Sequence, residues 1–305
     1  MSKRFLVQYK AIRMVFLVLI VALVFTVMFT ENKFVAKRKL YVSFARSDSI
    51  QAYIIKKGFS FLPVIYQKNI DPDNDGIFDR HRFVEYATDN FVNYDGLIAL
   101  DWEGKAYQDL IDIFTPMELN NTAKSYIDPL VLLKNINLRK IETGYYGLPS
   151  KYSTRNNTDH KEKNHLDELY SFVDVLYPSL YLNKNSIFPG ESIGFVKQHL
   201  LNALKTGCSK KKIYAFITHR WHPNSKYSPN ALIPISIFEK YITTIKNTNH
   251  KGCFLDGIVW WGADEIWYDK KKSVRDSINK YGSIQKFIQQ EIEKYANVIW
   301  KQLNE

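Results

Sequence analysis

A short apolar run, Gly96 to Leu100, ends in Asp101-Trp102-Glu103 and constrains the fold of this chain more than any other feature. A run this short and this apolar is typical of a strand buried on both faces, as in a parallel sheet. Because side chains alternate along a strand, Asp101 and Glu103 should point to one face and Trp102 to the other. Two acids so close cannot both ionise cheaply, so one can stay protonated near neutral pH. The alternative is a pair of strand-end acids bridged to a Lys or Arg.

Further apolar runs of strand length recur along the chain, with helix-like stretches between them. The strand-like runs are residues 40–44, 61–66, 97–100, 142–148, 173–177, 213–217 and 257–261. This alternation predicts a TIM-like parallel β/α barrel of seven or eight strands. With 305 residues, the chain is long enough for one such domain with a large core. Active sites of barrels lie at the carboxyl ends of the strands, which is where the acid pair falls.

The amino end of the sequence predicts a membrane segment. Residues 1–13 form a short basic tail, 14–30 are uncharged and apolar, 31–38 form a stalk, and 39–305 form the barrel domain. The apolar run is just long enough to span a bilayer, and bulky residues stand where a cleavage site would be. We therefore expect an uncleaved signal anchor with the barrel on the exoplasmic side (cell surface, periplasm or lumen). Secretion after cleavage is the alternative.

The composition limits which kinds of molecule this protein is expected to bind. Aromatic residues make up 15% of the chain, including 20 Tyr and 6 Trp, which suits a groove that stacks on sugar rings or bases. The net charge is +11, and the basic tail and stalk contribute much of it. The chain has no Gly-rich phosphate loop, and its histidines show no metal-binding spacing. We therefore expect no cofactor, no nucleotide and no nucleic-acid partner.

Aromatic side chains at or near the ends of the predicted strands could wall a sugar-binding groove. They are Tyr145, Tyr146, Tyr177, Tyr181, Tyr214 and Trp261. Each taken singly is more often a packing residue. Together with Asp101 and Glu103 they predict a carbohydrate site.

Four motifs, in order along the chain, resemble those of the hyaluronidase family of glycoside hydrolases, which includes the bee-venom and mammalian enzymes. They are the Asp-x-Glu that follows an apolar strand (Gly96 to Glu103), Gly-Tyr-Tyr-x-x-Pro (Gly144 to Pro149), Tyr-Pro-Ser-Leu-Tyr-Leu (Tyr177 to Leu182) and Val-Trp-Trp-Gly (Val259 to Gly262). The resemblance covers roughly residues 40–290 and is that of a divergent member.

The resemblance implies a role for four residues. Glu103 would be the proton donor and Asp101 the carboxylate that orients the acetamido group of the substrate. Tyr181 would hydrogen-bond to that acetamido group, and Trp261 would line the same pocket. The implied activity is endo-hydrolysis of a hyaluronan- or chondroitin-like polysaccharide containing N-acetylhexosamine. The acetamido oxygen would act as the nucleophile, with retention of configuration.

The sequence departs from the family pattern at two places. Gly104-Lys105 follows Glu103, where the animal enzymes usually have Trp-Arg. The tyrosine of the family's sixth strand region has no clean match, and Tyr214, Phe216 or His219 could take its place. Two other functions stay open: a non-catalytic glycan-binding protein on the same barrel, and a muramidase-like barrel hydrolase.

An acidic segment before residue 80 has the spacing of a calcium loop. Asp71, Asp73, Asp75 and Asp79 stand at ligand positions 1, 3, 5 and 9, with Gly76 at the sixth. Arg82 replaces the bidentate Glu at the twelfth position. The segment is therefore a weak calcium candidate, and an acidic loop without a metal is the alternative.

The two cysteines are predicted to form a disulfide. Cys208 lies five residues before Ile213, and Cys253 lies five before Ile258. These isoleucines begin consecutive predicted strands, so both cysteines should lie at the amino-terminal rim of the barrel. Adjacent strands are about 4.8 Å apart, and a disulfide tolerates Cα separations of roughly 4.4–6.8 Å. Two buried free thiols are the alternative.

Overall fold

The computed structural model describes residues 37–44, 48–112, 116–149, 163–183, 189–208 and 210–304. The chain divides into two units, Met1–Lys37 and Arg38–Glu305, and the second unit contains the strands and helices. The expected basic tail, membrane segment 14–30 and most of the stalk lie outside the described residues. Within the described ranges, no helix combines the length and apolar character that crossing a membrane requires.

Parallel strands form the centre of the second unit. They are β1 (Lys39–Phe44), β2 (Ser60–Phe61), β3 (Val64–Tyr66), β4 (Gly96–Asp101), β5 (Ile141–Tyr145), β6 (Val175–Leu176), β7 (Lys212–Ile217) and β8 (Gly257–Gly262). Their order is β2-β1-β8-β7-β6 in one sheet and β3-β4-β5 in the other, and all of these pairings are parallel. The sequence-based prediction of a parallel α/β fold is confirmed.

Backbone contacts at two places join the two sheets into a ring. β2 and β3 are one strand interrupted at Leu62-Pro63, because proline has no N–H for the ladder. The Leu62 N–H still donates to Val42 on β1, and the Ala99 N–H on β4 donates to Pro63. On the opposite side, a parallel bridge pairs Tyr146 with Tyr177. The described strands therefore close a barrel in which β2 and β3 share one position.

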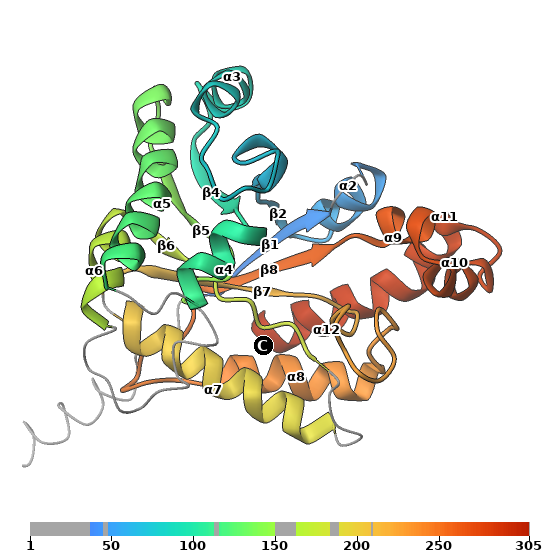
Figure 1. Ribbon diagram of the computed structural model, residues 1–305. Coiled ribbons are helices and arrows are strands. Elements are labelled where there is room, and N and C mark those ends of the chain that lie inside the picture. Colours follow the sequence, from blue (N-terminus) through green and yellow to red (C-terminus); the bar gives the residue numbers. More distant parts are fainter. Residues whose placement is uncertain are drawn as a thin grey trace, which may run out of the picture. The chain divides into compact units, whose positions relative to one another are not determined.

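Helices follow the strands along the chain and pack outside them (Figure 1). Around β2 to β6 they are α2 (Asp48–Lys56), a 3-10 turn (Gln67–Asn69), α3 (Arg80–Phe91), α4 (Gly104–Asp112), α5 (Pro116–Ile136) and α6 (Lys163–Phe172). The later ones are α7 (Pro189–Gly207), α8 (Ile235–Asn247), α9 (Asp264–Lys270), α10 (Lys272–Asn279), α11 (Ile284–Phe287), a π turn (Ile288–Ile292) and α12 (Glu293–Asn304). Helix α8 packs against both α7 and α12, and α5 packs against α3 and α6.

The alternation along β4 decides which way the acid pair points. Leu97 and Ala99 belong to the cluster inside the barrel, whereas Ile98 and Leu100 belong to the larger core between barrel and helices. Trp102 continues the outward series and is 1% exposed. Asp101 therefore continues the inward series at the carboxyl end of the strand, as period two requires.

The predicted disulfide is confirmed. Cys208 and Cys253 are bonded, their Cα atoms lie 5.9 Å apart, and the bond spans 45 residues of sequence. It joins the segment between α7 and β7 to the turn before β8, so it lies at the amino-terminal rim of the barrel as expected.

Candidate active site

Asp101 and Glu103 form the electrostatic centre of the site. Burial raises the pKa of Asp101 well above its ordinary value, and the neighbouring charge of Glu103 raises it further. Glu103 reaches solvent, but the protein atoms around its carboxyl still raise its pKa by desolvation. Within the described part of the chain, neither carboxyl forms an ion pair with a Lys or Arg. The pair can therefore hold a proton where ordinary carboxyls have lost theirs.

One oxygen of Asp101 has no hydrogen-bond partner among the residues that the structure describes. This oxygen is Oδ1, and it is buried. A buried carboxylate oxygen without a donor is costly, and sites of this kind are commonly completed by a ligand. An N–H donor on a bound molecule would remove the cost.

Aromatic side chains from three strand ends surround the acid pair. The rings of Tyr181 and Trp261 are stacked, 5.9 Å apart between centroids and 23° apart in plane. Tyr146 lies 5.9 Å from Tyr181, and its hydroxyl is 3.0 Å from the hydroxyl of Ser179. Burial raises the pKa values of Tyr146 and Tyr181, and the charges of Asp101 and Glu103 raise them further, which requires these four groups to be close. The structure therefore brings together Asp101, Glu103, Tyr146, Tyr181 and Trp261.

Tyr66 belongs to the same site and was missed in the sequence. It is the last residue of β3, the register partner of Asp101 on β4, and only partly buried. Burial raises the pKa of its hydroxyl, which interacts with the side chains of Trp261 and Ser43. The signal that could have found it is the run Val64-Ile65-Tyr66, an apolar strand that ends in a tyrosine, as β5 does at Tyr145.

Tyr145 does not reach this site. It follows Gly144 on β5 in the outward series, is 1% exposed, and packs at 4.7 Å between ring centroids against Tyr126 of α5. Its hydroxyl donates a hydrogen bond to the backbone oxygen of Tyr126 at 2.8 Å. Because adjacent residues of a strand face opposite sides, only one of Tyr145 and Tyr146 can face the barrel interior, and it is Tyr146.

Tyr177 and Tyr214 also lie away from the acid pair. Both are buried inside the barrel, with their ring centroids 6.5 Å apart. Tyr214 packs edge-on against Tyr41 at 5.3 Å, and it pairs in register with Gly257, the first residue of β8. These two side chains therefore fill the amino-terminal half of the barrel, and the structure does not place them where a substrate at the carboxyl ends would touch them.

The other two candidates for the sixth strand region do not offer a polar group to the site. Phe216 packs against Tyr146 at 5.0 Å and is buried. His219 is fully buried; its Nδ1 accepts the indole N–H of Trp260 at 3.1 Å, and its Nε2 lies 3.0 Å from Asp264. Because Nδ1 is an acceptor, the proton of the neutral ring belongs on Nε2, where it faces the carboxylate.

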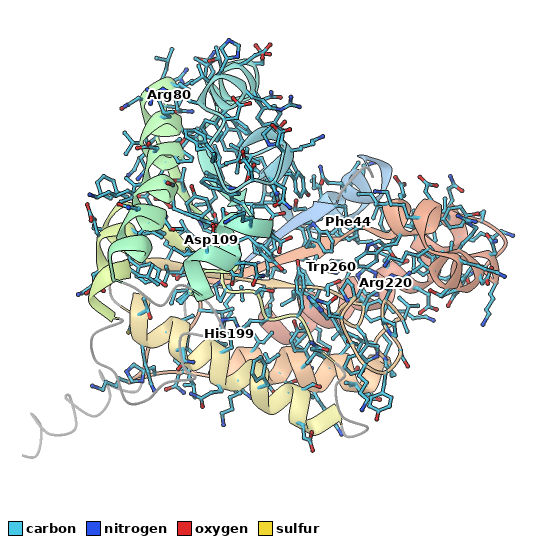
Figure 2. The ribbon with its side chains drawn as sticks, viewed as in Figure 1. Phe44, Arg80, Asp109, His199, Arg220 and Trp260 are labelled. Atoms are coloured by element: carbon cyan, nitrogen blue, oxygen red, sulfur yellow. A yellow bond between two sulfur atoms is a disulfide. The ribbon has the colours of Figure 1, made fainter. Side chains whose placement is uncertain are left out.

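Arg220, labelled in Figure 2, forms a buried cluster with His219 and Asp264. Its Nε donates to Oδ1 of Asp264 at 2.7 Å, and its Nη1 donates to the backbone oxygen of Asn230 at 2.9 Å. Burial alone would raise the pKa of Asp264, but Arg220 and His219 outweigh it and hold that pKa below its ordinary range. The cluster joins the segment after β7 to the start of α9. Its His219 contacts Trp260, which precedes Trp261 in the chain.

In the described structure, aspartates of the weak calcium candidate accept hydrogen bonds from backbone N–H groups. Asp71 accepts hydrogen bonds from the backbone of Asp75 and Gly76 at 3.2 and 3.0 Å. Asp79 caps α3 by accepting the N–H of Arg82 at 3.0 Å. Among the described residues, no group of three or more His, Cys, Asp or Glu side chains could hold a metal ion. The hydrogen bonds of this segment are those expected of the acidic-loop alternative.

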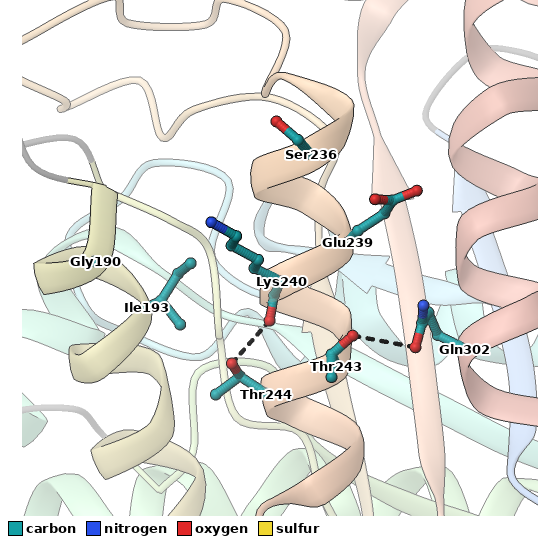
Figure 3. Close-up of a pocket in the computed structure, with 8 residues that line it drawn as sticks. All are labelled: Gly190, Ile193, Ser236, Glu239, Lys240, Thr243, Thr244 and Gln302. Carbon is teal, nitrogen blue, oxygen red and sulfur yellow. Dashed lines mark hydrogen bonds between the residues drawn. The ribbon is translucent and has the colours of Figure 1, made fainter.

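An open groove of about 590 Å³ lies on the outer helices (Figure 3). It is lined by Gly190, Ile193, Ser236, Glu239, Lys240, Thr243, Thr244 and Gln302. Two of its hydroxyl groups have partners on the helices: Thr243 donates to Gln302 at 3.1 Å, and Thr244 donates to the backbone oxygen of Lys240 at 2.8 Å. None of the residues of the carboxyl-end site line this groove.

Comparisons with known proteins bear on the fold. No family model matches the chain, and no curated protein matches it in sequence. A crystal structure of bee venom hyaluronidase superposes with a TM-score of 0.57 at 14% identity, over 85% of this chain and 99% of that one. The structure of bee venom hyaluronidase in complex with hyaluronic acid tetramer has the same TM-score and identity, over 86% and 98%. The chain thus has a fold similar to that of bee venom hyaluronidase.

Proposed function

We propose that this protein is a glycoside hydrolase that cleaves a hyaluronan- or chondroitin-like polysaccharide at an N-acetylhexosamine residue. The observation that carries the proposal is the buried, unpartnered Oδ1 of Asp101 beside Glu103, at the carboxyl end of a barrel strand. The tyrosine and tryptophan rings around it supply apolar faces and hydroxyls of the kind that bind sugars. The likeness to a structure that holds a hyaluronic acid tetramer supports a polysaccharide as substrate.

The acid pair suits a reaction assisted by the substrate. The acetamido N–H donates to Oδ1 of Asp101, which turns the acetamido oxygen toward the anomeric carbon. That oxygen attacks while Glu103 gives its proton to the leaving glycosidic oxygen, so the C–O bond to the next sugar breaks and an oxazolinium forms. The ionised Asp101 stabilises its positive nitrogen. Water then attacks the anomeric carbon from the opposite side. The bond between that carbon and the acetamido oxygen breaks, the acetamido group is restored, and the water gives a proton to Glu103, with net retention.

The aromatic residues hold the acetamido group in this geometry. In the proposal, the Tyr181 hydroxyl hydrogen-bonds to the acetamido oxygen, and Trp261, which stacks on Tyr181, packs against the methyl group. Tyr146 positions Tyr181 through their adjacent hydroxyls, and Tyr66 interacts with the Trp261 side chain. A reaction of this kind needs no carboxylate across the sugar ring, which agrees with two acids on one strand.

We also propose how the chain is attached to a membrane and on which side the barrel lies. In it, residues 14–30 anchor the chain and the barrel lies on the exoplasmic side, with secretion after cleavage as the alternative. The Cys208–Cys253 disulfide supports an oxidising compartment.

The test compares the wild-type protein with Glu103→Gln on hyaluronan, chondroitin, chitin and peptidoglycan. We expect wild type to release products with a new N-acetylhexosamine reducing end of retained configuration, seen by NMR during the reaction. Glu103→Gln should bind the same oligosaccharides and lose turnover by about 10²–10⁴-fold, because the leaving oxygen has no proton donor. Turnover by Glu103→Gln near that of wild type would refute the proposal. Binding by wild type without cleavage would favour the glycan-binding alternative.

A further inference from the structure

The segment 67–79, between β3 and α3, contacts the chain on both sides of Glu103. Before it, Oδ2 of Asp71 accepts the indole N–H of Trp102 at 3.2 Å. After it, Oδ1 of Asn74 accepts the backbone N–H of Lys105 at 3.0 Å. Asp71 and Trp102 are each 1% exposed, so the first contact is sheltered from water.

Trp102 is held at three places besides the strand itself. Its ring stacks on Tyr126 at 4.7 Å and 21°, and the Tyr126 hydroxyl donates to the backbone oxygen of Trp102 at 3.0 Å. Phe78, from the segment 67–79, lies 6.1 Å from the same ring. The indole N–H, the ring face and the carbonyl are therefore all fixed on the outer side of the barrel.

Gly104 shows how closely the segment 67–79 approaches. Its φ is +67°, a conformation that favours glycine, and a Cβ at this position would overlap Oδ1 of Asn74. That same oxygen also accepts a hydrogen bond from Gln67 at 2.8 Å. The Gly-Lys that follows Glu103 is thus the residue pair that lets the segment 67–79 dock there.

We propose that Asp71 is a positioning residue, which holds Trp102 from behind and so aims Asp101 and Glu103 into the barrel together. The proposal rests on the proposed function, since it assigns Asp71 to that same acid pair. The three residues are consecutive, so fixing the side chain and carbonyl of the middle one fixes the inward direction of its neighbours. Asp71 can do this because its carboxylate binds Asp75, Gly76 and Trp102 at once.

The test uses Asp71→Asn and Trp102→Phe in the full chain, with Asp75→Asn as the matched control. Asp75 belongs to the same segment, is exposed, and accepts the N–H of Ile77 at 2.8 Å, so the control makes the same chemical change nearby. Trp102→Phe keeps an aromatic ring and removes the N–H, and it decides the question if Asp71→Asn fails to fold. Melting temperature and circular dichroism establish folding for each variant.

We expect Asp71→Asn and Trp102→Phe to lower kcat by about 10–100-fold with KM changed by less than about twofold, because a displacement near 1 Å costs that much. The titration of the Glu103 carboxyl, followed by ¹³C NMR and assigned with Glu103→Gln, should shift in both variants. Asp75→Asn should leave kcat and the titration as in wild type.

Two failures are distinguishable. If folded Asp71→Asn and Trp102→Phe match Asp75→Asn in both kcat and the Glu103 titration, the positioning role is refuted and the proposed function stands. If wild type cleaves nothing, or Glu103→Gln is fully active, the proposed function fails. The Glu103 titration then decides on its own whether Asp71 positions the acid pair.

Discussion

Glu103 lies two residues beyond Asp101, and its charge adds to burial in raising the pKa of Asp101. Since burial also raises the pKa of Glu103, the pair binds a proton more tightly than two separate surface carboxyls would. A site of this kind can donate a proton at a pH where free carboxylic acids are ionised.

The first prediction concerns the pH dependence of activity. The reaction needs one proton on the pair, so kcat/KM should fall as the pH rises through the raised pKa and that proton is lost. It should also fall in acid, where the pair holds a second proton and Asp101 no longer carries the charge that stabilises a positive acetamido nitrogen. A bell-shaped profile of kcat/KM against pH is expected. A profile that still rises well above neutral pH would contradict the role of Glu103.

The second prediction concerns stability. The folded-state pKa of Asp101 is above its unfolded value, so the free energy of unfolding is highest below the unfolded pKa and falls as the pH rises through the folded pKa. Asp101→Asn has no ionisable group at this position, so its free energy of unfolding does not fall in this way as the pH rises. At pH 8 we expect the inactive variant to be about 1–3 kcal/mol more stable than wild type, the cost of an unpartnered buried acid.

Urea unfolding at pH 8 and at pH 3 measures this effect. The gain should shrink toward zero at pH 3, where wild-type Asp101 is protonated in both states. An equal gain at both pH values would show that ionisation of Asp101 is not its cause.

The third prediction separates two tyrosines by position. Tyr181→Phe should lower kcat by about 10-fold or more, because its hydroxyl binds the acetamido group in the proposed reaction. Tyr214→Phe makes the same change at the amino-terminal half of the barrel, so kcat should be nearly unchanged. Steady-state kinetics of both folded variants on one substrate is the measurement. Equal losses would mean that the two hydroxyls are not distinguished by their distance from the acid pair.

The fourth prediction concerns the buried cluster of Arg220, His219 and Asp264. Asp264 is fully buried between Arg220 and His219, so Asp264→Asn leaves an uncompensated buried guanidinium and should lower the free energy of unfolding by about 3–5 kcal/mol at pH 7. Since the folded pKa is depressed, the stabilisation is present above the unfolded pKa and is lost in acid. Asp269→Asn, at an exposed position of α9, is the control and should change stability little.

The fifth prediction concerns the disulfide. It closes a loop of 45 residues, so Cys208→Ser should lower the free energy of unfolding by about 4 kcal/mol. Urea unfolding of wild type with and without dithiothreitol provides the comparison, since reduction should produce the same loss. Identical unfolding curves under both conditions would refute the contribution of this bond.

Local patterns in the sequence were sufficient for some features. The apolar run of β4 predicted that Asp101 and Trp102 face opposite sides of the strand, because side chains along a strand alternate with period two. The equal offsets of Cys208 and Cys253 before their strands gave the disulfide. Both inferences depend only on residues close in sequence and on the regular geometry of parallel strands.

Other features depend on contacts between distant segments. Two tyrosines stand in succession at Tyr145-Tyr146, and only the neighbouring strands decide that Tyr146 is the inward one. The depth of Tyr214 in the barrel depends on its register with β8. The aspartates of the segment 67–79 have the spacing of a metal loop, but this spacing equally suits acceptors of N–H groups. The contact between Asp71 and Trp102 joins residues that are 31 apart in the sequence, and no local pattern predicts it.

The disulfide also determines what a protease would produce from this protein. Between Cys208 and Cys253 runs an exposed stretch that includes Pro223, Asn224, Lys226 and Tyr227. A cut after Lys226 would fall inside the covalent loop, so the two fragments would stay joined through sulfur. Such nicked protein would migrate as one band on a non-reducing gel and as two after reduction, and both halves of the barrel would remain attached.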